Sequence, residues 1–215
     1  FDQGGGLVNV GNSWKVLKDL AHSDTAKQVL RYDIATFCPF QSDGQGTAAY
    51  WRTPGGAPDG PENVTFRVSP VFHPDLTPDE KDTFFRSFSF KSEAPWLKVA
   101  SGDRYIRGDM AMSVNLRYDA SHFDAMGVYS ARVIANQDGG DLGGLAGREF
   151  TLWNTVVVGD AFSASNDYMR VYEGRDLAQS SAHRYYVDAP AGATAMRVRL
   201  EVSEDVGSSR GARVL

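Results

Sequence analysis

The chain has 215 residues, of which 42% are hydrophobic and 23% charged, and its formal net charge is −5. Lys and Arg form no cluster that could neutralise phosphates, which argues against a nucleic-acid surface and against a polybasic membrane patch. No apolar run approaches the roughly 18–20 residues that a membrane-spanning helix needs. A single cysteine, Cys38, excludes an intrachain disulfide and a cysteine-based zinc cluster.

The first predicted element is a helix over residues 9–21, which follows a glycine-rich opening at Phe1–Val10. Asn9 is the predicted N-cap, because its side-chain oxygen can accept an otherwise unpaired amide of the first turn. The apolar side chains recur at helical spacing, at Val10, Trp14, Leu17, Leu20 and Ala21. We interpret this segment as a helix that packs on a core and takes no part in chemistry.

Residues 39–61 are rich in proline and glycine and predict a loop. The periodicity then changes to that of strands, with apolar and polar side chains alternating from 64 to 69. Further strands are predicted at 84–90, 96–99, 113–118, 127–135 and 149–158. In the first of these, Phe84, Arg86, Phe88 and Phe90 share one side. Short strands at this spacing indicate a mainly β fold, an antiparallel β-sandwich of the fibronectin type III, immunoglobulin or jelly-roll kind.

A second change of pattern comes at Gly159-Asp160. Residues 185–202 predict a strand, a Pro-x-Gly turn at Pro190–Gly192, and a strictly alternating strand that opens a second sandwich. We therefore expect three parts: 1–22, 23–158 as a β-sandwich, and 159–215 as the start of a second, incomplete β-sandwich domain. The first residue is not Met and no signal peptide is evident, so a processed or excised segment is expected.

No catalytic constellation is visible in the sequence. The histidines are His22, His73, His122 and His183, and no nucleophile elbow or Gly-Thr-Ser-Met-Ala segment accompanies any of them. We interpret them as surface or edge residues. The predicted set of catalytic, cofactor-binding and metal-binding residues is therefore empty, and no cofactor is expected.

Three short motifs have a functional and a structural interpretation. Arg107-Gly108-Asp109 matches an integrin-recognition tripeptide but is interpreted as a turn between strands. Asn63-Val64-Thr65 matches the N-glycosylation pattern, with the same low specificity. Asp138–Asp141 offers two carboxylates for calcium, but without further carboxylates at loop spacing we interpret it as a connector between strands.

Several segments, taken in order, resemble one protein family. The opening Gln3–Val10 with its helix is similar to the end of a subtilisin-like catalytic domain. The segments 68–72, 92–99, 124–135, 150–158 and 184–200 are similar to the sandwich that follows it and to the start of the next domain. The chain thus resembles the region after the catalytic serine in the tripeptidyl peptidase II-like branch of the subtilase family. It departs from the family pattern at Phe150–Val156.

The resemblance implies a parent enzyme that hydrolyses peptide bonds, with its triad located before Phe1. The residues of this chain are then a non-catalytic accessory region, inactive alone, that braces the catalytic domain or mediates substrate or oligomer contacts. Its implied partners are its own catalytic domain, a peptide substrate or further copies of the same chain. No nucleic-acid partner and no membrane span are expected. The expected location is extracellular. The alternative is a surface adhesion or carbohydrate-binding β-sandwich, which would bind through exposed aromatic side chains or through the Arg107–Asp109 turn. In the accessory region, by contrast, the aromatic side chains are expected to fill the core.

Overall fold

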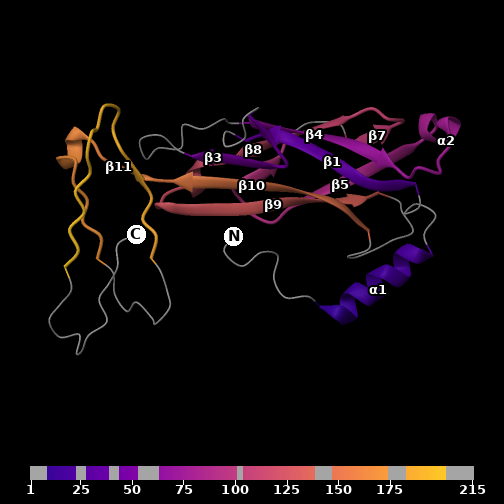
Figure 1. Cartoon of the computed structure of the whole chain (residues 1–215), viewed down its shortest axis with the longest axis horizontal. Helices are drawn as coiled ribbons and strands as arrows, with labels where there is room; N and C mark the ends of the chain where they lie inside the picture. The colour runs from indigo at the N-terminus through magenta and orange to yellow at the C-terminus, as the bar shows by residue number, and fades with distance from the viewer. Residues whose placement is uncertain are drawn as a thin grey trace.

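The computed structural model describes residues 9–22, 28–38, 44–52, 63–100, 104–138, 147–173 and 183–201. Its body consists of two five-stranded sheets (Figure 1). The first has the order β2-β1-β4-β8-β6 and contains β1 (Val29–Phe37), β2 (Gln45–Gly46), β4 (Asn63–Phe72), β6 (Leu97–Val99) and β8 (Met112–Tyr118). The second has the order β3-β10-β9-β5-β7 and contains β3 (Ala48–Arg52), β5 (Phe85–Ser92), β7 (Tyr105–Arg107), β9 (Gly127–Gln137) and β10 (Arg148–Val158).

The core lies between the two sheets. It is built from side chains at alternate positions of the long strands, because alternate residues of a strand point to the same face. Fully buried members are Phe66, Leu116, Phe88, Val133 and Leu152, from β4, β8, β5, β9 and β10. The predicted β-sandwich is confirmed. Nearly all of its strand pairs are antiparallel, and the exception is β3, which lies parallel to β10 at the edge of the second sheet.

Several sequence predictions are confirmed in detail. Helix α1 spans Val10–Ala21, and the Asn9 side chain accepts a hydrogen bond from the backbone amide of Asn12 at 3.0 Å. Val64, Phe66 and Val68 are buried as a set. The predicted aromatic core is also present, with Phe88 against Phe150 and Trp96 against Tyr118 and Phe123.

A tyrosine fixes the entry to β9. The Tyr129 hydroxyl donates to the backbone oxygen of Ala125 at 2.9 Å and accepts from the Ala125 amide at 3.3 Å. Its ring meets Phe123 edge to face, with the centroids 5.0 Å apart. Tyr129 thus anchors the corner at which the chain enters β9.

Two predictions need correction. The segment 39–61, predicted as a loop, contains β2 and β3, while residues 39–43 and 53–62 lie outside the described part of the chain. Strand β1 was not predicted, although polar Arg31 and Asp33 alternate with Tyr32 and Ile34 as in a strand with one exposed face. The Arg31 and Asp33 side chains form an exposed ion pair on the surface of the sheet, with Nε and Oδ1 2.9 Å apart.

Helices contribute little to the rest of the described chain. α2 (Pro78–Asp82) is a five-residue helix with a capping box between Thr77 and Glu80, and η3 (Ala120–His122) and η4 (Ala164–Asn166) are single turns. Beyond β10, the short strands β11 (Asp160–Ala161) and β12 (Val187–Asp188) pair in parallel. The alternating strand predicted at the end of 185–202 is not formed over 193–200, which pairs with no strand of the described residues.

Candidate functional site

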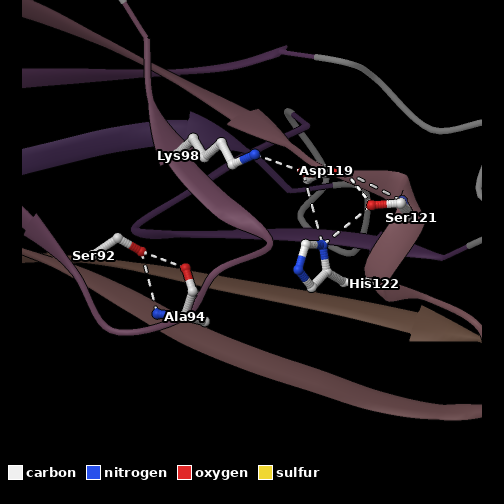
Figure 2. A network of polar contacts seen from close by, with 6 residues as sticks. All are labelled: Ser92, Ala94, Lys98, Asp119, Ser121 and His122. Carbon is white, nitrogen blue, oxygen red and sulfur yellow. Dashed lines mark hydrogen bonds and ion pairs between the residues drawn. The ribbon is translucent and has the colours of Figure 1, made fainter.

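A serine, a histidine and an aspartate lie together at one surface turn, which makes this turn the site to test for chemistry (Figure 2). Asp119 follows β8 and is the N-cap of η3. Its Oδ1 accepts from the Ser121 hydroxyl at 2.6 Å and from the Ser121 amide at 3.3 Å. Its Oδ2 lies 2.5 Å from Nζ of Lys98, which β6 brings alongside.

These donors favour the charged form of the carboxylate. The Lys98 ammonium, followed by the Ser121 hydroxyl, lowers the pKa of Asp119 well below its ordinary range. The backbone amide of Asp119 also donates to the Trp96 oxygen at 2.7 Å. The turn therefore ties β6 to the end of β8, close to where Trp96 enters the core.

The geometry is not that of a catalytic triad. A triad needs the base to reach the nucleophile through one ring nitrogen and the aspartate through the other. Here Nδ1 of His122 faces both groups, at 3.4 Å from the Ser121 hydroxyl and 3.8 Å from Asp119. The Ser121 hydroxyl donates to Asp119, so His122 is not the group that receives its proton. Ser92 and Ala94, also drawn in Figure 2, form a separate local turn in which the Ser92 hydroxyl donates to the Ala94 oxygen at 3.0 Å.

The remaining histidines lie on separate elements. Nδ1 of His22 is 2.7 Å from the Lys18 oxygen at the end of α1, and His73 lies 3.3 Å from the exposed Asp75 carboxylate. His183 is exposed. Among the described residues, no three acidic, histidine or cysteine side chains converge as a metal-binding group would require. The empty set of catalytic residues stays a prediction.

The short motifs occupy strand ends. Arg107-Gly108-Asp109 forms the predicted turn after β7, where Gly108 has φ +59 and donates its amide to the Phe84 oxygen at 2.8 Å. Arg107 and Asp109 are exposed. Asn63 is exposed at the start of β4, and the Thr65 hydroxyl of the same motif donates to Asn115 at 2.7 Å. Most of Asp138–Asp141 lies outside the described residues.

Sequence reasoning missed a buried ionic network that joins the sheets. Arg86 on β5 lies 2.8 Å from Glu149 on β10, and their side chains are only 2% and 12% exposed. Tyr32, from β1 of the other sheet, donates to the same carboxylate at 2.7 Å and accepts from Arg86 at 3.1 Å. Burial raises the pKa of Tyr32 far above its ordinary value, because an ionised phenol would lose its hydration there. The alternating pattern placed Arg86 on the same side as Phe84 and Phe88. Its partner Glu149 could not be predicted, because it is remote in sequence.

A second buried polar contact crosses the core. The Tyr118 hydroxyl on β8 donates to the Asn154 side chain on β10 at 2.9 Å, and the Asn154 amide group donates to the Leu152 oxygen at 3.1 Å. Both residues are buried. These contacts satisfy polar groups inside the sandwich, and the one between Tyr118 and Asn154 joins the two sheets.

The comparisons with known proteins bear on the family. No family model matches the chain. The chain is 22% identical over 191 residues to pyrolysin of Pyrococcus furiosus, a match that covers 86% of this chain and 12% of that protein. The solved structure of tripeptidyl peptidase 2 superposes on 78% of this chain with a TM-score of 0.58 and 19% identity, and 13% of that protein is covered. The resemblance to the tripeptidyl peptidase II-like subtilases is confirmed.

This resemblance concerns the fold, and it covers only part of each of the two proteins. The chain spans about an eighth of the length of each protein, given the coverages of 12% and 13%. The chain therefore corresponds to a small segment of each of these two proteins. No helix in the described residues is long and apolar enough to cross a membrane.

Proposed function

We propose that this chain is a non-catalytic accessory region of a subtilisin-like serine peptidase, which braces the catalytic domain or mediates substrate or oligomer contacts. The observation that carries the proposal is the match to two peptidases, in sequence and in fold, over a small part of each. The geometry at Asp119 adds support, since its serine and histidine are arranged as a turn and not as a base and a nucleophile.

The proposed contact with the catalytic domain is made by α1. Its apolar side chains Val10, Trp14 and Leu17 are 75%, 61% and 57% exposed, and no residue of the helix is buried. An isolated helix of 12 residues is marginal in water. An uncovered stripe on such a helix favours a partner that buries it. We assign that partner to the peptidase domain expected before residue 9.

The proposed domain organisation follows the distribution of buried residues. The sandwich within 23–158 has its own core, whereas Met196, Val198 and Leu200 form a stripe that is more than half exposed. Such alternation is typical of a strand with one buried face. We propose that 1–22 belongs to the catalytic domain, 23–158 is the accessory sandwich, and 159–215 begins a second β domain. An extracellular location is part of this proposal.

Two measurements test it. The coding sequence upstream of Phe1 should contain a Gly-Thr-Ser serine helix within roughly one domain length. The chain alone should not react with a fluorophosphonate probe of serine hydrolases. Reaction that Ser121→Ala abolishes, or an upstream region without the serine helix, would overturn the proposal. Labelling of a fusion that contains the upstream region serves as the positive control.

One observation favours the alternative of an adhesion or carbohydrate-binding module. Phe85 and Tyr105 are 62% and 50% exposed and stack at 5.6 Å next to the Arg107–Asp109 turn. Exposed aromatic faces bind sugar rings. A glycan array would detect such binding. Binding that Phe85→Ala removes, while Phe37→Ala at an exposed position of β1 leaves it intact, would favour this alternative over the peptidase accessory role.

A further inference from the structure

The chain leaves the sandwich through a short joint. β10 ends at Val158, and Gly159 leads into β11, whose only strand partner among the described residues is β12. The Asp160 amide donates to the Tyr186 oxygen at 2.8 Å, and the Phe162 amide donates to the Asp188 oxygen at 3.2 Å. In Figure 1 the joint lies at the end of β10, where the C-terminal segment projects from the sandwich. None of the described residues after Gly159 is buried, so few contacts fix the position of this segment.

A charged contact crosses from the sandwich to the joint. Arg52, at the end of β3, reaches Asp188 with Nε at 3.3 Å and the Val187 oxygen with Nη2 at 2.7 Å. Because β3 lies parallel to β10, with Arg52 opposite Val157, the guanidinium arrives where β10 ends. A planar guanidinium can hold a carboxylate and a carbonyl at the same time, which a lysine ammonium cannot do with fixed geometry.

The Asp188 carboxylate is held in a confined space. Its side chain is only 10% exposed, and a Cβ atom placed on Gly159 would lie 2.7 Å from Oδ2. Glycine at 159 therefore makes room for the carboxylate. A carboxylate so buried needs a cationic partner, because its hydration has been removed.

We propose that Arg52 and Asp188 form a latch that holds residues 184–201 against the end of the sandwich, so that the junction at Gly159 is a rigid joint and not a flexible linker. Contacts on both sides reinforce it. The Tyr172 hydroxyl donates to Asp160 at 2.9 Å, the Tyr172 and Tyr185 rings are 4.5 Å apart, and the Tyr186 amide donates to the Met126 sulfur at 3.3 Å. The latch does not depend on the peptidase assignment.

Hydrogen exchange tests the latch. The amides of Asp160 and Phe162 report on the joint, and the Phe88 amide, bonded to the Arg104 oxygen at 2.7 Å, reports on the sandwich. Arg52→Ala should speed exchange at Asp160 and Phe162 by about tenfold or more, as expected when a hydrogen bond to a charged group is lost. Exchange at Phe88 should not change. Arg31→Ala, which removes the exposed ion pair with Asp33, is the matched control and should leave both joint amides as in the wild type.

Two further variants keep the test decisive if Arg52→Ala unfolds the whole chain. Arg52→Lys retains the charge but not the planar fork and should give an intermediate acceleration at Asp160 and Phe162. Gly159→Ala should displace the carboxylate and also accelerate both amides, while Phe88 stays protected. Wild-type exchange rates at Asp160 and Phe162 in folded Arg52→Ala would overturn the latch. If Arg52→Ala unfolds, wild-type rates at both amides in both Arg52→Lys and Gly159→Ala would overturn it.

Discussion

Two polar clusters of similar composition differ in their surroundings. The Arg86–Glu149–Tyr32 network is buried between the sheets, whereas the Lys98–Asp119–Ser121–His122 cluster lies at a surface turn. Each joins a carboxylate to a cation and a hydroxyl. Inside the sandwich, removal of one partner leaves a charge without hydration, but at the turn water replaces it. Burial, and not the set of residues, therefore decides what each cluster contributes.

The largest expected effect comes from Glu149→Ala. It leaves the buried Arg86 without its carboxylate, and we expect a loss of about 3–5 kcal/mol in the free energy of unfolding. Urea denaturation measures this. The matched control is Glu93→Ala, which removes a similar contact, 2.6 Å from Arg132, where both side chains are about a third exposed. The control should cost less than about 1 kcal/mol. Equal losses in the two variants would contradict the comparison.

The buried tyrosines predict a decline in stability at high pH. Burial raises the pKa of both Tyr32 and Tyr118 above the ordinary value. Above a pH of about 10, the unfolded chain releases these protons while the folded chain keeps them. The unfolded state then binds fewer protons, so the free energy of unfolding falls as the pH rises through this window and is unaffected by these groups below it.

Urea denaturation at a series of pH values between 8 and 12, roughly the range around the ordinary tyrosine pKa, measures this decline. Tyr32→Phe and Tyr118→Phe should each make it less steep, although each variant also loses a hydrogen bond and starts from a lower stability. Tyr105→Phe, at an exposed position, is the control and should leave the slope as in the wild type. A slope that no buried substitution changes would show that these phenols ionise freely.

A smaller effect is expected at the surface cluster. Asp119→Ala removes the cap of η3 and the Lys98 contact, and should lower the free energy of unfolding much less than Glu149→Ala does. The loss should shrink further at high salt, because exposed charges are screened. Lys98→Ala, which removes only the ion pair, should cost less than Asp119→Ala. A loss as large as that of Glu149→Ala, measured by urea denaturation, would show that the turn contributes to the core.

The same contrast explains how far the sequence predicts the fold. Alternation placed Phe84, Arg86 and Phe88 on one face, and all three are buried. It could not supply Glu149 as the partner of Arg86, since that contact depends on which strands become neighbours. The parallel edge strand β3 lies in a segment whose proline and glycine content predicts a loop. His122 was interpreted as a surface or edge residue and lies at a surface turn. The contact of Asp119 with Lys98 at the same turn depends on the pairing of β6 with β8.

Substitutions in α1 are expected to have the smallest effect on the free energy of unfolding. This distinguishes the helix from the sandwich, where buried contacts contribute to stability. Trp14→Ala should change the free energy of unfolding of this chain by no more than about 0.5 kcal/mol, because an exposed side chain loses little contact. Lys15→Ala on the polar face is the control and should behave alike. In a protein that includes the preceding peptidase domain, only Trp14→Ala should lower the thermal stability, because only the apolar stripe is buried there. A large loss in the isolated chain would mean that α1 packs on the sandwich, and the proposed contact with the catalytic domain would then fail.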